Sequence, residues 1–147
     1  MYKKILVPLD GSNLAEIALS HAESLASQYH AELVLLTVID PPTMTGRDGI
    51  AVDLFRHEMD TKIEEAEIYL KVLKDQFEKR KISTKVIVSV GSVVRNIIET
   101  ANGESADLVL IASHGHSGLK RVFFGSVAAG VLNRIEQALM VIRQPAE

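Results

Sequence analysis

Short apolar segments alternate along the chain with longer segments in which apolar residues recur at helical spacing. The first two apolar segments are nearly continuous, which is typical of parallel strands that are covered on both faces. Five strands are expected, at Lys4–Pro8, Glu32–Ile39, Thr84–Val90, Leu108–Ala112 and 138–143. The pattern therefore predicts a parallel sheet whose strands are joined by helices.

Helical spacing predicts four helices between these strands. They are expected at about 13–29, 53–79, 93–102 and 126–135. Asn13 has the position of an N-cap for the first helix, and Glu16 would complete a capping box. Residues 43–52 lack a clear periodicity, which predicts a loop before the long second helix.

The alternation of strand and helix predicts one domain over residues 1–147. The expected fold class is α/β, with a doubly wound five-stranded parallel sheet of flavodoxin or Rossmann type. With the strand order 3-2-1-4-5, the first and fourth strands are neighbours, and the winding reverses between them. Their carboxyl ends are Pro8, Leu9 and Asp10 on one side and Ile111, Ala112 and Ser113 on the other. A ligand crevice is expected at this point.

A glycine-rich loop follows the fourth strand and ends where the last helix begins. Gly115 and Gly118 permit unusual backbone conformations or the close approach of a ligand. At the helix start, the amides of Gly125 and Ser126 and the Ser126 hydroxyl can donate to a phosphate. The spacing of the glycines matches neither the Walker A motif nor the GxGxxG motif. A loop without a ligand, in which the glycines only form turns and Ser126 only caps the helix, would give the same sequence. A loop of about a dozen residues in a compact domain is nevertheless more often functional than idle.

Composition restricts the classes of function. The chain has 147 residues, a formal charge of −3 and no cysteine. The charge gives no general attraction to nucleic acid or acidic lipid, and the absence of cysteine removes disulfides and thiolate metal sites. The apolar runs are too short to cross a membrane, and the first strand follows the initiating residues directly. A cytoplasmic protein that binds neither nucleic acid nor membrane is expected.

Further candidate residues lie at the other strand ends. Asp10 is positioned for a ribose hydroxyl or a metal–phosphate complex, and Val38 for an adenine ring. Gly91 gives a second point of close approach, although each of these residues also fits an ordinary turn or core position. His114 is a candidate to hydrogen-bond a phosphate. His114 and His116 point to opposite sides of an extended loop, so no metal site is expected, and no sequence motif of a serine hydrolase occurs.

Several motifs in order along the chain resemble the universal stress protein family. They are KKILVPLDGS, LLTVID, VGS, ASHGHSGLKRVFFGSV and LMVIR. The resemblance covers nearly the whole chain and implies a flavodoxin-like domain that, in one branch of the family, binds ATP and usually forms homodimers. It places phosphates at Gly115, Gly125, Ser126 and Val127, the ribose or metal near Asp10, and adenine at the backbone around Val38. The family motif usually opens with glycine, where this chain has Ala112.

Two function hypotheses follow. In the first, the protein is a stress-response regulator that binds ATP with magnesium and acts on unknown protein partners. Hydrolysis of ATP would be slow if it occurs, because no residue is evidently placed to activate water. In the second, favoured by Ala112, it is a nucleotide-free dimeric interaction module. A phospho-receiver domain would need an acceptor aspartate where Val90-Gly91 stands. A flavin carrier is compatible with the fold, but an aromatic content of 5% without tryptophan offers no stacking platform for a flavin.

The last strand, at 138–143, is apolar on both faces but is expected at an edge of the sheet. An apolar strand with an unpaired edge favours pairing with another chain. We therefore expect a homodimer joined through this strand.

Overall fold

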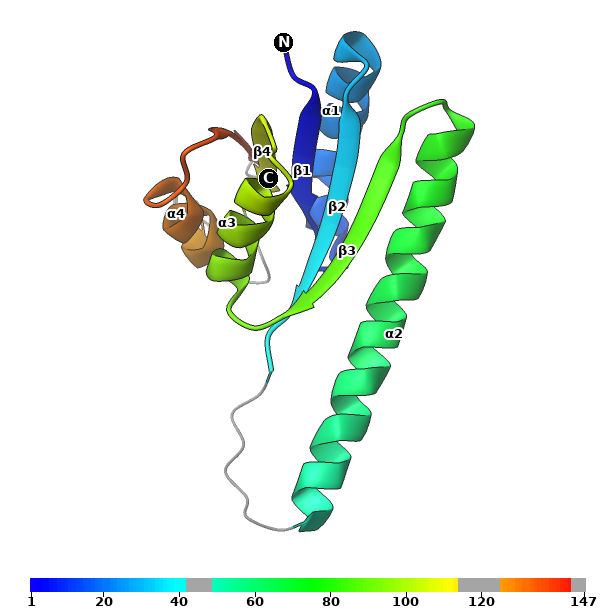
Figure 1. Ribbon diagram of the computed structural model, residues 1–147, viewed down its shortest axis with the longest axis vertical. Coiled ribbons are helices and arrows are strands. Elements are labelled where there is room, and N and C mark those ends of the chain that lie inside the picture. The colour runs from blue at the N-terminus through cyan, green and yellow to red at the C-terminus, as the bar shows by residue number, and fades with distance from the viewer. Residues whose placement is uncertain (42–48, 114–124, 144–147) are drawn as a thin grey trace.

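The computed structural model describes residues 1–41, 49–113 and 125–143 (Figure 1). The strands are β1 (Lys4–Pro8), β2 (Glu32–Ile39), β3 (Thr84–Val90), β4 (Leu108–Ala112) and β5 (Ala138–Ile142). The helices are α1 (Asn13–Tyr29), α2 (Gly49–Lys79), α3 (Val93–Gly103) and α4 (Gly125–Leu132). Strand and helix alternate along the chain as predicted.

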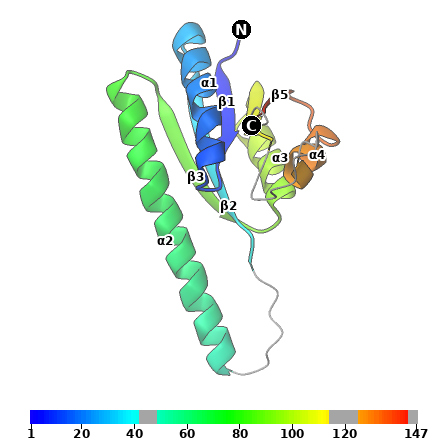
Figure 2. The ribbon, with the colours of Figure 1, turned by 180° about the vertical axis from the view of Figure 1, so that it is seen from behind.

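The five strands form one parallel sheet in the order β3-β2-β1-β4-β5, which confirms the predicted fold class and strand order. In the register of the sheet, Ile5 of β1 lies beside Leu33 of β2 and Leu108 of β4. β1 is therefore the central strand, and the two strands that flank it continue into helices on opposite faces (Figures 1 and 2). This arrangement creates a switch point between β1 and β4.

Side chains alternate between two apolar clusters, one on each face of the sheet. Ile5, Leu33 and Leu35 are fully buried with residues of α1 and α2. Leu6 and Val34, one residue further along each strand, are fully buried with residues of α3 and α4. Because both faces are covered, consecutive residues of the central strands are all apolar, which explains the continuous apolar runs in the sequence.

The N-cap of α1 is Ser12, so the prediction of Asn13 was wrong by one residue. Ser12 has extended dihedrals, and its hydroxyl accepts a hydrogen bond from the N–H of Ala15 at 3.2 Å. Asn13 is already helical and cannot take the capping conformation. Glu16 does not complete a capping box within the hydrogen bonds of the described residues, and it contacts α2 instead.

The long second helix begins at Gly49, so residues 49–52 of the predicted loop at 43–52 are helical, and the loop prediction was wrong there. Residues 43–48 lie outside the described part of the chain. α2 has 31 residues and is about 46 Å long, whereas β2 has 8 residues and spans about 26 Å. The amino-terminal part of α2 thus extends well beyond the carboxyl ends of the strands (Figure 1).

The helical spacing of apolar residues that predicted this helix corresponds to its buried face, since Met59, Ala66, Leu70 and Phe77 are all buried. Two ends differ slightly from the prediction: α4 stops at Leu132 rather than at residue 135, and β5 stops at Ile142 rather than at residue 143. Both shifts are within the usual uncertainty of element ends. None of the described helices is long and apolar enough to cross a membrane.

α4 packs closely on α3. A Cβ built on Gly130 of α4 would lie 2.9 Å from Cγ2 of Val94 in α3, so glycine allows the two helices to approach. The buried side chains of Ala128 and Val131 continue the same contact into the core. α3 and α4 therefore form one packed layer over their face of the sheet (Figure 1).

Candidate functional site

The carboxyl ends of β1 and β4 form the point at which the sheet winding reverses. β1 leads into α1 on one face, while α4 covers the other face beside β4 (Figure 1). Ligands of doubly wound α/β domains bind in the crevice that opens at such a point. The residues that end these two strands are therefore the first candidates for a site.

On the β1 side, Pro8 ends the strand and Leu9 is buried, with its N–H donating to the carbonyl oxygen of Leu36 at 2.8 Å. Asp10 is exposed, and its Oδ1 accepts a hydrogen bond from the N–H of Ser12 at 2.9 Å. This contact is the turn role expected of an aspartate before glycine, and it holds the carboxylate at the rim of the crevice.

On the β4 side, Ile111 is buried and Ala112 is half-buried within the strand, paired with Ile142 of β5. Ala112 is not among the residues with positive φ, so its backbone conformation is open to any residue. The ladder continues beyond it, because the N–H of Ser113 donates to the carbonyl oxygen of Ile142 at 2.8 Å. Alanine in place of glycine is therefore accommodated here without backbone strain.

α4 begins directly against the end of β4. Gly125 has a φ of 59°, in the left-handed region, and a Cβ built there would lie 3.1 Å from the carbonyl oxygen of Ser113. Ser126 is exposed, whereas Val127 is half-buried against the core. The structure thus brings a helix start, whose first amides have no partner within the helix, to the carboxyl end of β4, at the switch point.

The strand ends of β2 and β3 lie further along the same edge. Val38 is half-buried against the α3–α4 layer. Gly91 has a φ of 137°, and its N–H donates to the carbonyl oxygen of Ile39 at 2.9 Å. This positive φ favours glycine at the turn, and a Cβ there would also lie 2.9 Å from Nδ2 of Asn96, at the end of a side chain that can move.

Three of the predicted site residues, His114, Gly115 and Gly118, lie outside the described residues. Asp10 and Ala112 lie at the carboxyl ends of the adjacent strands β1 and β4, and Gly125 begins α4 beside Ser113, while the glycine-rich part of the loop lies outside the described residues. Within the described ranges, no group of three or more His, Asp or Glu side chains could hold a metal ion.

Buried hydroxyls at the strand ends were not found from the sequence. Thr37, Ser89 and Ser113 each carry a buried hydroxyl oxygen without a hydrogen-bond partner among the described residues. All three lie at or near the carboxyl end of a strand. The signal that could have found them is a hydroxyl residue inside or directly after an apolar strand, where a core side chain is expected.

The polar contacts at the amino-terminal edge of the sheet differ from those at the carboxyl edge. Oδ2 of Asp107 accepts hydrogen bonds from the N–H groups of Lys3 and Lys4, at 2.8 and 2.9 Å. Nζ of Lys85 donates to Oε1 of Glu104 at 2.7 Å, and this contact lowers the pKa of the Glu104 carboxyl. These charged groups at the amino-terminal edge are paired, whereas Oε1 of Gln137 at that edge and the three hydroxyls at the carboxyl edge lack partners among the described residues.

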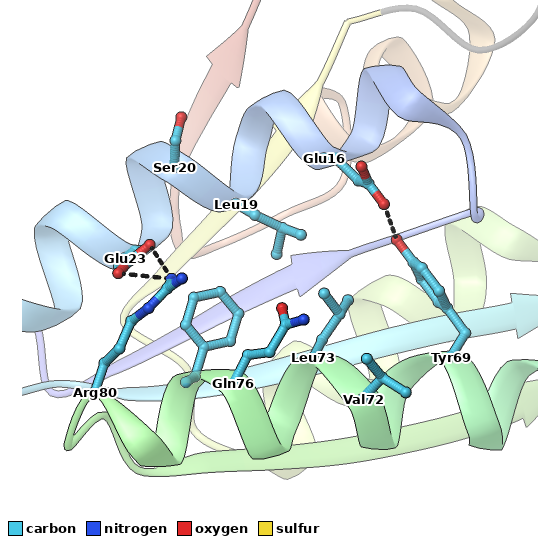
Figure 3. Close-up of a pocket in the computed structure, with 10 residues that line it drawn as sticks. Glu16, Leu19, Ser20, Glu23, Tyr69, Val72, Leu73, Gln76 and Arg80 are labelled. Carbon is cyan, nitrogen blue, oxygen red and sulfur yellow. Dashed lines mark hydrogen bonds and ion pairs between the residues drawn. The ribbon is translucent and has the colours of Figure 1, made fainter.

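A groove of about 430 Å³ lies between α1 and α2, on the other side of the sheet from α4 (Figure 3). The Tyr69 hydroxyl donates to Glu16 across one end of it at 3.3 Å, and Arg80 pairs with Glu23 at 2.9 Å across the other (Figure 3). Two carboxylates on its rim disfavour a phosphate. The groove is therefore not the candidate nucleotide site.

Tyr69 should titrate far above an ordinary tyrosine. Burial, then the charge of Glu16 and the hydrogen bond to it, and last the charge of Asp10 raise the pKa of Tyr69 from 10.0 to about 12. The folded protein therefore holds this proton more tightly than the unfolded chain. Its contribution to stability is complete below pH 10 and is lost as the pH rises toward 12.

We expect Tyr69→Phe to remove the part of the stability loss at alkaline pH that comes from ionisation of Tyr69. Urea unfolding at about pH 9 and about pH 11 should show a smaller loss of stability in the variant than in the unmodified protein. The difference between their ultraviolet absorbance titrations should give the Tyr69 midpoint. A midpoint near that of a free tyrosine would contradict the expectation.

The fold, with its switch point between β1 and β4, defines the class of doubly wound, flavodoxin-like α/β domains. Within that class, the model of the universal stress protein family matches residues 1–143, and the chain belongs to this family. This finding confirms the family resemblance seen in the sequence motifs.

Similar proteins are alike over their whole length. Universal stress protein MJ0577 of Methanocaldococcus jannaschii is 33% identical over 156 residues, covering 98% of this chain and 96% of the relative. Universal stress protein YxiE of Bacillus subtilis is 28% identical over 154 residues, covering 97% of this chain and 100% of the relative. The similarity that supports the family assignment therefore extends over nearly the whole of this chain.

Solved structures agree with the fold. The structure of MJ0577 matches with a TM-score of 0.83 at 33% identity, covering 100% of this chain and 99% of the other. Universal stress protein UspA from Lactobacillus plantarum matches with a TM-score of 0.86 at 24% identity, covering 97% and 98%. The second match, at its lower identity, bears on the fold alone.

Proposed function

We propose that this protein binds ATP, with magnesium, in the crevice between β1 and β4 and acts as a nucleotide-dependent regulator of a stress response. The observation that carries this proposal is the contact of Gly125 with the end of β4. A Cβ at this position would lie 3.1 Å from the Ser113 carbonyl oxygen, so glycine keeps the first amides of α4 open at the switch point. Helix starts of this kind favour phosphate.

The described residues fit an adenine nucleotide. Asp10, exposed at the rim, would accept from a ribose hydroxyl or take part in holding magnesium. The half-buried Val38 would contact the adenine, and the amides of Gly125 and Ser126 would hold phosphate oxygens. Ala112 does not oppose this arrangement, because its φ is not positive.

Relatives support the choice of an adenine nucleotide. One universal stress protein, 22% identical to this chain with a TM-score of 0.64, has been solved in complex with cAMP. Another, from Archaeoglobus fulgidus, 19% identical with a TM-score of 0.68, has been solved in complex with dAMP. Both ligands combine adenine, a sugar and a phosphate, which is the chemistry that the crevice would recognise.

The proposed role is a switch rather than a catalyst. The carboxylate of Asp10, at the end of β1, serves the turn through Ser12. No described group is placed as a general base for an attacking water. Nucleotide occupancy would instead bias the position of α4 and so change the surface that is presented to partner proteins.

Native mass spectrometry and titration calorimetry test the proposal. Gently purified protein is expected to carry a bound adenine nucleotide, and the stripped protein is expected to bind ATP in the presence of magnesium with 1:1 stoichiometry per chain. Adenosine should bind more weakly, because it lacks the phosphate contacts. Protein that retains no nucleotide and shows no heat of ATP binding at any tested concentration would contradict the proposal.

The second candidate function is a nucleotide-free dimeric interaction module. It is favoured by Ala112, which adds a methyl group where the family motif usually has glycine. The same mass spectrum separates the two candidates, since this module would appear as a dimer without added mass.

A further inference from the structure

The groove between α1 and α2 has an apolar floor and an exposed rim (Figure 3). Leu19 and Phe77 are buried at this floor, and Leu73 beside them is half-buried. Val72 lines the same groove and is 51% exposed, and Gln76 on the rim is exposed as well. Because a site for a small molecule encloses most of its ligand, an open groove of this kind is better suited to an elongated partner.

The apolar surface of the groove continues along α2. Ile68 is 59% exposed and lies one helical turn before Val72, so the two side chains are neighbours on the helix surface. β-branched residues have a lower helix propensity than straight-chain residues such as Glu67 and Lys71, and at exposed positions they bury little apolar area in return. Single exposed apolar residues are common, but a neighbouring pair beside an apolar groove indicates a surface for a partner.

The two helices that form the groove are acidic. α1 and α2 contain ten acidic and five basic residues, a formal charge of −5, whereas the whole chain carries −3. Glu16, at one end of the groove, contacts the neutral hydroxyl of Tyr69, so this contact leaves its negative charge in place. Glu65 is exposed one turn before Tyr69 on α2, while Arg80 balances Glu23 at the other end. The groove therefore presents negative charge beside apolar surface.

We propose that this groove is the docking site for a basic amphipathic helix of a partner protein. Apolar residues of that helix, spaced three and four positions apart, pack on the floor and on Val72, while its Lys or Arg residues pair with Glu16 and Glu65. Glu16 and Glu23 are seven residues apart on α1, which is about 10 Å, so the groove matches about two turns of a docked helix. The groove and α4 lie on opposite faces of the sheet, so the docking site is independent of the nucleotide site proposed above.

The probe is a synthetic peptide of about four helical turns, with leucine along one face of the helix and lysine at all other positions. A second peptide carries glutamate in place of every lysine. Fluorescence anisotropy with the full-length protein should show saturable 1:1 binding of the lysine peptide. The glutamate peptide should bind at least about 10-fold more weakly, because its charges repel those of the groove.

The charge of the groove is tested by the double variant Glu16→Gln and Glu65→Gln. Its affinity for the lysine peptide should be about 5-fold lower, since two exposed ion pairs are lost. The matched control is Glu99→Gln with Glu136→Gln, which removes two exposed carboxylates elsewhere and should leave the affinity unchanged.

The apolar surface is tested by Val72→Ser. Its affinity for the lysine peptide should be about 5-fold lower, because Val72 no longer contributes apolar area to the contact. Leu54→Ser is the control on the same helix: Leu54 is 59% exposed and lies about 27 Å before Val72 along α2. All four residues changed in the groove variants and in this control are exposed, and circular dichroism checks that each variant is folded.

Three results would overturn the docking site. The first is the absence of saturable binding of the lysine peptide to the unmodified protein. The second is equal binding of the lysine and glutamate peptides, because charge would then not select the partner. The third is a loss of affinity in either control that equals the loss in its groove variant, because the peptide would then bind elsewhere or by general attraction. ATP binding enters none of these measurements, so the nucleotide site is tested separately.

Discussion

Gly125→Val should lower the affinity for ATP by at least about 100-fold and the free energy of unfolding by about 1–3 kcal/mol. The φ of 59° at Gly125 is a conformation that β-branched residues strongly avoid. In addition, the new Cβ would lie 3.1 Å from the Ser113 carbonyl oxygen, which belongs to a paired strand and cannot easily move. The first turn of α4 would therefore shift, and its amides would no longer meet a phosphate.

Gly103→Val is the matched control for this substitution. Gly103 ends α3, a Cβ there meets no atom within 4 Å, and its φ is not positive. Its affinity for ATP should be unchanged. Circular dichroism and thermal unfolding establish that Gly125→Val is folded at the assay temperature, and Gly125→Ala provides a milder change at the same position. An unchanged ATP affinity in folded Gly125→Val would reject the start of α4 as the phosphate site.

The second large effect concerns assembly. We propose that the protein is a homodimer joined through the outer edge of β5, and we expect Met140→Lys to give a monomer at micromolar concentration. β5 pairs with β4 alone among the described strands, and its apolar residues from Leu139 to Ile142 are only half-buried. An open apolar edge favours pairing with a second copy, and a lysine on the edge opposes it.

Val90→Lys is the control at the opposite edge of the sheet. Val90 ends β3 and is 47% exposed, so the substitution adds the same charge to the other edge strand. Sedimentation velocity should show a dimer for the unmodified protein and for Val90→Lys, and a monomer for Met140→Lys. Thermal unfolding of Met140→Lys checks that the domain remains folded. A monomeric unmodified protein would contradict the assembly itself.

The strands could be predicted because two independent signals agree in the sequence. The apolar run of β2 stops at Asp40, and β1 ends at Pro8 before the Asp10-Gly11 turn, so composition and turn chemistry mark the same ends. The strand order followed from the family of doubly wound folds and from the burial that continuous apolar runs require.

The helix starts were harder to predict, because several residues could take the same role. Ser12 and Asn13 are both good N-caps, and the choice depends on which one takes the extended conformation after Gly11. The start of α2 at Gly49 was missed, because a glycine followed by a β-branched residue has low helical propensity. The helix begins there despite this local preference, which shows that propensity alone does not fix the start of a helix.

The candidate site was predicted only in part. Asp10 and the start of α4 follow from glycine positions and strand ends, which are visible in the sequence. The buried hydroxyl of Ser113 was missed, although a hydroxyl residue directly after an apolar strand is visible in the sequence, because its burial and its missing partner among the described residues are known only from the structure. Tyr69 lies 59 residues from Asp10 in the sequence, and the reach of the Asp10 charge to it arises only from the packing of α2 beside α1.

The close contact between Gly130 and Val94 joins α4 to α3 within the layer that both helices form on one face of the sheet. No methyl group fits between α4 and α3 here unless Val94 moves, so the two helices pack as one unit. A displacement imposed on Gly125 by whatever occupies the crevice would therefore pass along α4 and move α3 as well. The outer surface of this helix pair would report occupancy to a protein that never touches the ligand.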